Sequence, residues 1–291
     1  DYGVTWSTPV RLSSNIGSSA SPSVACSSNG QYVYLAWQDN TRGNNEIYFR
    51  KSTNYGGAWS AAVRLSSNMG SSASPSVACS STGQYIYIVW MDNTPGNDEI
   101  YFRRSTDYGG AWSGAVRLTS NMGSSASPSV ACSANGRYVY LVWHDRTPGN
   151  FEIYLKRSTN YGQTWSAAAR ITLYTGSSVF PSVACSSNGQ YVYLAWADNK
   201  PGNFEICFKR SVNYGVSWGS TVRMTIDAGW SREPVAACSS TGQYVYIAWA
   251  DNKPGNYEIY LRRSVNYGAS WSTAVRLTSN TGASRYPSVI C

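Results

Sequence analysis

Apolar and polar side chains alternate along this chain in short runs that are separated by turn residues. Between Pro75 and Ser127 the apolar runs cover residues 76–79, 85–90, 99–104 and 112–118. Short alternating runs rich in Val, Ile, Tyr and Trp are typical of half-buried β-strands. No stretch shows a sustained helical period, so the pattern predicts an all-β protein with four short strands in each unit.

The same unit returns every 53 residues, which is clearest for its tryptophan and cysteine positions: Trp6, Trp59, Trp112, Trp165, Trp218 and Trp271, and Cys26, Cys79, Cys132, Cys185, Cys238 and Cys291. A fixed period of this size indicates an array, a solenoid or a propeller. Four antiparallel strands per unit favour a β-propeller, whose blades pack radially on one another. We therefore predict one β-propeller domain over residues 1–291, with the recurring tryptophans packed between blades.

The number of blades depends on the two ends of the sequence. Residues Trp6 to Leu12 are predicted as a fourth strand, five complete blades follow, and Ser288 to Cys291 are predicted as a first strand. This order favours six blades, five complete and one split, with the split blade completed by further residues or by another copy of the chain. The alternative is a five-bladed ring closed by the N-terminal strand, which leaves residues 266–291 to pair with a neighbour.

A short motif marks the third turn of each unit. Residues 52–59 (STNYGGAW) fit the pattern S-x-D-x-G-x-x-W with Asn in the acid's place, and copies follow at 105–112, 158–165, 211–218 and 264–271. This motif resembles the Asp-box, or BNR repeat, of sialidase-like β-propellers, where it is a folding device between the third and fourth strands. Only Asp1 and Asp107 keep the acid. Because Asn makes the same turn hydrogen bonds, the structural role is expected to survive.

Composition and charge limit the classes of partner. Charged residues make up 13% of the chain, and the net charge of +8 comes from Arg and Lys spread over all units. Nucleic-acid binding requires a concentrated basic footprint, so we predict none. No apolar run is long enough to span a membrane. The polar, weakly charged composition is typical of secreted or cell-surface binding proteins.

Two acidic positions recur around the turn between the second and third strands: Asp39, Asp92, Asp145, Asp198 and Asp251, and Glu46, Glu99, Glu152, Glu205 and Glu258. Clustered carboxylates suit calcium, but this spacing differs from that of the known D-x-D-x-D-G loop. The preferred interpretation is a turn cap with ion pairs to neighbouring Arg and Lys. No Cys or His spacing indicates zinc. We predict no metal and no cofactor, with calcium as the alternative.

The resemblance to sialidases also provides a test for catalysis. Those enzymes use three arginines, a Tyr nucleophile assisted by Glu, and an Asp acid/base. Their early Phe-Arg-Ile-Pro motif does not occur here, and nearly identical blades offer little of the asymmetry that one active site needs. A Ser-His-Asp arrangement would depend on His144, the single histidine, which we expect at the surface. We predict no catalytic residues.

Candidate binding residues are those that break the repeat. The connectors between the fourth strand of one unit and the first strand of the next are nearly identical at 66–78 and 119–131, but diverge at 172–184, 225–237 and 278–290. In a propeller these connectors surround the channel mouth. Aromatic and Arg side chains there suit sugar stacking or a protein hot spot. The predicted ligand-binding residues are Tyr174, Phe180, Trp230, Arg232, Glu233, Arg285 and Tyr286.

These observations lead to three hypotheses about function. The first is a non-catalytic extracellular propeller that binds glycans or a partner surface, with avidity from repeated sites. The second is a structural subunit that polymerises by strand exchange as a homo-oligomer. The third, least favoured by the sequence, is a sialidase-like exo-glycosidase.

Overall fold

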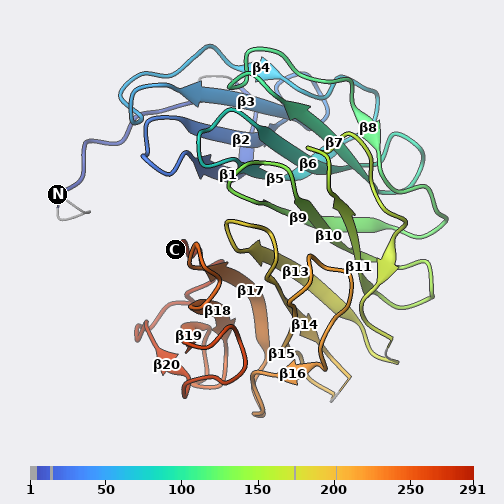
Figure 1. The fold of residues 1–291 in the computed structure, drawn as a ribbon, viewed down its shortest axis with the longest axis vertical. Helices are drawn as coiled ribbons and strands as arrows, with labels where there is room; N and C mark the ends of the chain where they lie inside the picture. The colour runs from blue at the N-terminus through green and yellow to red at the C-terminus, as the bar shows by residue number, and fades with distance from the viewer. Residues whose placement is uncertain (1–4, 14–15, 174, 201) are drawn as a thin grey trace.

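A computed structural model describes residues 5–13, 16–173, 175–200 and 202–291 (Figure 1). These residues form five separate sheets, each of four antiparallel strands that pair in sequence order. They contain no helix, and therefore none that could cross a membrane. The predicted all-β propeller with four-stranded blades is confirmed, and the ribbon shows the blades following one another around an arc.

Strands in equivalent positions have equivalent bounds. The first strands are β1 Ser19–Cys26, β5 Ser72–Cys79, β9 Ser125–Cys132, β13 Ser178–Cys185 and β17 Ser231–Cys238. The second strands are β2 Val33–Asp39, β6 Ile86–Asp92, β10 Val139–Asp145, β14 Val192–Asp198 and β18 Val245–Asp251. The third strands are β3 Glu46–Ser52, β7 Glu99–Ser105, β11 Glu152–Ser158, β15 Glu205–Ser211 and β19 Glu258–Ser264. The fourth strands are β4 Val63–Arg64, β8 Val116–Arg117, β12 Ala169–Arg170, β16 Val222–Arg223 and β20 Val275–Arg276.

The second strands form the core because blades pack on both of their faces. Strands β10 and β14 are buried along their whole length, although their sequences alternate like half-exposed strands. Tyr residues of the second strands form hydrogen bonds to the next blade. The Tyr87 hydroxyl donates to Gly136 O, and the Tyr140 hydroxyl donates to Gly189 O at 2.6 Å. The blade interface is thus fixed by buried aromatic area and a hydrogen bond.

Four of the recurring motif tryptophans, Trp112, Trp165, Trp218 and Trp271, pack between blades as predicted, whereas Trp6 is 88% exposed, contrary to the prediction. The ring of Trp112 meets Phe49 of the preceding blade edge to face, with centroids 4.9 Å apart. Trp165 makes the same contact with Phe102 at 5.1 Å. Edge-to-face pairs of this kind are a favoured aromatic geometry.

The turns that carry the S-x-D-x-G-x-x-W pattern keep their hydrogen bonds whether Asp or Asn is present. Asp107 Oδ1 accepts from the N–H of Ala111 at 2.9 Å, and Asn54 Oδ1 accepts from the N–H of Ala58 at 2.8 Å. In both turns a Ser hydroxyl bonds the same side chain. The prediction that Asn preserves the structural role is confirmed.

The fourth strands are shorter than the sequence pattern predicted. Residues 112–118 were expected to form one strand, but only Val116–Arg117 does. At the start of this stretch the N–H of Arg104 donates to the hydroxyl of Ser113, at 3.1 Å, instead of to a backbone carbonyl. The regular ladder therefore begins only after the motif turn has ended.

The predicted strands Trp6 to Leu12 and Ser288 to Cys291 are not strands in the described chain, where no neighbouring strand lies beside them to pair. The C-terminal segment still begins as a first strand does: Ser284 N–H donates to Tyr257 O, as Ser231 N–H does to Phe204 O. It lies between the last blade and the first (Figure 1). The described residues thus form five complete blades, and neither terminal segment pairs with a strand to close the ring.

Candidate binding site at the channel mouth

Each first strand carries a β-bulge where it enters the channel mouth. In β1, for example, the register shifts between Ala20 and Ser23, and Ser21, which precedes the repeated Pro22, adopts a left-handed backbone. At this repeat position six residues have a left-handed backbone: Ser21, Ser74, Ser127, Phe180, Glu233 and Tyr286, with φ from 50° to 56°. Such φ values are uncommon outside Gly. A bulge turns a side chain away from the regular alternation of its strand.

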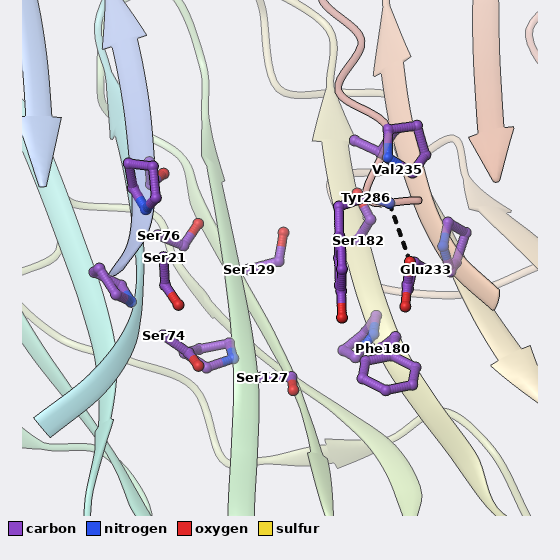
Figure 2. A pocket seen from close by; sticks show the side chains of 17 residues that line it. Ser21, Ser74, Ser76, Ser127, Ser129, Phe180, Ser182, Glu233, Val235 and Tyr286 are labelled. Carbon is purple, nitrogen blue, oxygen red and sulfur yellow. Dashed lines mark hydrogen bonds between the residues drawn. The ribbon is translucent and has the colours of Figure 1, made fainter. Parts of the chain in front are cut away.

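These six residues and their prolines line a cavity of about 400 Å³ at the channel mouth (Figure 2). Serines occupy the positions from the first three blades, and Phe180, Glu233 and Tyr286 occupy the other three. Half of the rim is therefore small and polar, while the other half is aromatic and acidic. The structure brings these three predicted site residues together on one wall.

Glu233 is held on this wall by two partners. One carboxylate oxygen accepts from the Arg285 guanidinium, and the other accepts from the N–H of Tyr286 at 3.1 Å (Figure 2). Arg285 lies over the rings of Tyr257 and Tyr286, at 4.9 and 5.1 Å. The hydrogen bond to Glu233 raises the pKa of Arg285. The guanidinium is thus permanently charged and fixed between two aromatic faces.

Arg232 forms a second cluster outside the cavity wall. Its guanidinium lies 4.5 Å from the ring of Phe204 and 4.4 Å from the ring of Trp230. Its Nε is buried without a hydrogen-bond partner among the described residues. Trp230 and Arg232 were predicted on the same face as Tyr286, near the channel mouth; they stack on each other and do not line the cavity. Tyr174, the remaining predicted residue, lies outside the described residues.

His144 contacts Phe180 of the cavity wall through a hydrogen bond and a ring contact. The prediction of a surface histidine is wrong: its side chain is only 7% exposed, because the rings of Phe151 and Phe180 pack against it. Its Nδ1 accepts from the N–H of Phe180 at 3.4 Å, and its ring meets Phe151 edge to face at 4.8 Å. Burial lowers the pKa of His144 to about 4.

Three further aromatic residues, which the comparison of connectors missed, contact His144 or predicted site residues. Phe151, Phe204 and Tyr257 occupy one position in the turns between second and third strands, where the first two units have Asn45 and Asp98. Phe151 contacts His144, Phe204 contacts Trp230, and Tyr257 contacts Arg285. A comparison of this turn position across the repeats would have found these residues. It separates the two units with a polar residue from the three units with an aromatic one.

Cross-strand pairs at the rim match a large residue with a small one. Arg232 pairs with Ala250, whereas Met91 pairs with Ala73. The large residue thus lies on the first strand in one blade and on the second strand in another, and in both blades it faces an alanine. Departures from the repeat are therefore packed into the structure, which argues against loosely tolerated surface variation.

The recurring acids cap turns, as predicted. Glu152 is fully buried and accepts from Arg170 at 2.9 Å, from Asn150 and from the hydroxyl of Thr172. Asp198 caps its turn through the N–H of Lys200 at 2.9 Å. These carboxylates are surrounded by N–H and O–H donors, and no group of three metal-ligating side chains occurs in the described chain. This donor set does not fit a calcium ion.

The recurring cysteines line the other end of the channel, in a cavity of about 410 Å³. All seven cysteines are free. Burial raises the pKa of Cys132 and Cys185 well above the usual thiol value. These two thiols are protonated near neutral pH and are poor nucleophiles.

Lowering the pH from 6.5 to 4 is expected to destabilise the protein through His144. Its pKa falls from an ordinary 6.5 to about 4 on folding, so across this window the unfolded chain takes up a proton that the folded chain does not. The cost is about 3 kcal/mol. Urea unfolding at pH 7 and pH 4 measures it.

The matched control is His144→Gln, because Gln38 occupies the equivalent position and its Oε1 accepts from the N–H of Ser74 at 3.0 Å. Other titrating groups are common to both proteins. An equal loss of stability in wild type and His144→Gln would show that His144 is not the source.

No protein-family model matches this chain, and no curated protein matches it. Solved structures do share its fold. A Hadza microbial sialidase, Hz136, is 13% identical with a TM-score of 0.62 over 91% of this chain and 60% of the sialidase. An ulvan lyase of polysaccharide lyase family PL25 is 10% identical with a TM-score of 0.62 over 92% of this chain and 75% of the lyase.

An endo-arabinase from Bacteroides thetaiotaomicron is 13% identical with a TM-score of 0.52, over 90% of this chain and 95% of the arabinase. This chain covers 60% of the length of the sialidase Hz136. The structural similarity shows a shared propeller fold, and at identities this low it shows the fold alone. The Asp-box assignment itself stays a prediction.

Proposed function

We propose that this protein is a non-catalytic, extracellular propeller that binds a glycan at the aromatic half of its channel mouth. The observation that carries the proposal is the cavity of about 400 Å³ with Phe180, Glu233 and Tyr286 on one wall. Sugar rings present apolar faces and hydroxyl edges. Aromatic faces with a few fixed polar groups are the usual complement of such ligands.

The neighbouring clusters extend this surface. Arg285 and Arg232 are each held against two aromatic rings, and only Arg285 has a carboxylate partner. A guanidinium held in this way donates hydrogen bonds with little loss of side-chain freedom. The similar structures bear the names of a sialidase, a polysaccharide lyase and an endo-arabinase, in keeping with a carbohydrate ligand.

The acids at the mouth argue against hydrolysis. Glycoside hydrolysis generally needs two carboxyl groups with separate roles. Among the described residues that line the cavity, Glu233 is the single acid, and both of its oxygens already have partners. We therefore propose binding without turnover.

Glycan-array binding before and after Phe180→Ser and Tyr286→Ser tests the proposal. Serine is the repeat's own residue at these positions, and Ser21, Ser74 and Ser127 accept the same left-handed backbone. We expect the double variant to keep its melting temperature and to lose roughly 1–3 kcal/mol of binding free energy, typical of truncated aromatic contacts at a binding site.

Unchanged array binding by the folded double variant would contradict the proposed site. Release of free sugar from any bound glycan by the wild type would contradict the non-catalytic part. If the wild type binds no glycan on the array, the glycan proposal is refuted, and a protein surface becomes the partner to test.

A second candidate function is assembly with other copies of the chain. Leu277 is 56% exposed, whereas its repeat equivalent Met224 is buried between blades at 1%. Val24 on the first blade is also exposed, unlike its buried equivalents Val77 and Val130. Light-scattering mass in solution tests this candidate. A concentration-independent monomer mass would exclude assembly.

A further inference from the structure

One face of the propeller carries apolar side chains that are almost completely exposed. Met69 and Met122 stand at equivalent positions of their connectors and are 97% and 99% exposed. Ile16 occupies the same position in the first connector, and Leu173 and Ile226 stand two residues before it in later ones. All of them are exposed. Isolated exposed apolar residues are common, but here successive connectors each present one.

Hydrogen bonds hold these connectors at the channel-mouth face. The side-chain amide of Asn44 donates to Gly70 O, next to Met69, and Asn97 donates to Gly123 O, next to Met122. A Cβ added to Gly123 would lie 2.2 Å from the N of Thr147, so this connector packs directly on the turn of the next blade. The apolar tips are therefore presented by fixed loops on the same face as the turns between second and third strands.

Those turns place positive charge beside the apolar tips. Arg42, Arg146, Lys200 and Lys253 are exposed at turn positions of four blades. The recurring acids of these turns, such as Asp198, are buried, and the partly exposed acids near the cations are Asp227, which lies 3.8 Å from the Lys253 amine, and Asp98, which bonds Ser124. The Asp-box turns on the other face have Val212, Val216 and Val265 as their exposed aliphatic residues.

This distribution suits a lipid surface better than a folded partner. The tips are separated by whole blades, and they do not form the contiguous apolar patch that a protein interface uses. A bilayer accepts each side chain independently, so scattered tips act together. Cations beside them are attracted to anionic headgroups. Trp230, half exposed on the same face, is an aromatic residue of the type that favours the membrane interface.

We propose that the channel-mouth face docks on anionic phospholipid membranes, with Met69, Met122, Ile16, Leu173 and Ile226 entering the headgroup region. The net charge of +8 favours the approach to such a surface. The docked propeller turns its channel mouth toward the membrane. The five apolar tips do not line the glycan cavity, so this inference does not depend on the proposed glycan site.

Sedimentation with vesicles tests the proposal, using phosphatidylcholine alone and an equimolar mixture with phosphatidylserine. We expect binding to the mixture that weakens with salt, and little binding to phosphatidylcholine. Met69→Thr/Met122→Thr uses the residue found at Thr175 and Thr281, and should weaken binding by about tenfold for each side chain. Lys200→Thr/Lys253→Thr uses the residue found at Thr94 and Thr147, and should weaken binding by roughly fivefold for each charge.

The control is Val212→Thr/Val265→Thr on the opposite face, where other repeats have Thr53 and Thr106. Each substitution copies a residue that another repeat has at the same position, so all variants are expected to keep the wild-type melting temperature. Binding is compared only among variants that do so. Equal sedimentation of wild type and the Met variant would overturn the proposal, as would no binding to either vesicle. Self-association of the wild type without lipid, lost in the Met variant, would assign the face to a second copy and also overturn it.

Discussion

Asp145→Ala is expected to lower the free energy of unfolding by about 4 kcal/mol, because one buried carboxylate satisfies several donors. Asp145 accepts from Ser125 and from Asn121, each at 2.7 Å, and from the N–H of Thr147 at 2.8 Å. Burial alone would raise its pKa, but these hydrogen bonds outweigh burial and lower it. Alanine would leave the donors buried and unpaired. Urea unfolding at pH 7 measures the loss.

The control for Asp145→Ala is Asp107→Asn, since Asn fills this position in four other repeats. That variant should leave the unfolding midpoint nearly unchanged. Calcium provides a further comparison: if the recurring acids cap turns, excess calcium leaves the stability of the wild type unchanged. A calcium-dependent rise that disappears in Asp145→Ala would refute the turn-cap account.

Trp112→Ala is expected to cost about 3 kcal/mol, near the lower end for removal of a large buried aromatic. Its indole is half-buried and contacts Phe49 across the blade interface at 4.9 Å. The loss comes from aromatic area returned to water and from the space left between two blades. Thermal or urea unfolding monitored by circular dichroism measures it.

The chain contains its own control at the same repeat position. Trp6 is 88% exposed, so Trp6→Ala should leave stability within about 0.5 kcal/mol of wild type. Equal effects of the two substitutions would mean that the repeated tryptophan acts through the turn itself and not through blade packing.

The fold followed from the sequence because each unit states the same pattern. Period-2 runs rich in Tyr, Val and Trp predict strands, and Gly-containing turns separate them. The limits of that pattern appear in β10, where both faces are buried although the residues alternate. Alternation cannot report a neighbour that covers the second face. It also cannot report Ser113, whose hydroxyl replaces a backbone acceptor and delays the fourth strand.

The candidate site was only partly predictable. Phe180, Glu233 and Tyr286 were found because they replace Ser at one repeat position, and the bulge places all three at the mouth. The burial of His144 was not predicted because the rings that cover it, Phe151 and Phe180, come from a turn and from the next blade, and no local pattern reveals them. Trp230 and Arg232 were predicted near the channel mouth, but the sequence did not indicate that the Arg232 guanidinium stacks on the Trp230 ring.

The central claim, that a glycan binds at the aromatic half of the channel mouth, is tested most directly by a crystal structure with the saccharide selected on the array. The account predicts the sugar ring against Phe180 and Tyr286, with its polar groups near Glu233. A saccharide bound at the cysteine end of the channel, or against the wall of Ser21, Ser74 and Ser127, would contradict it.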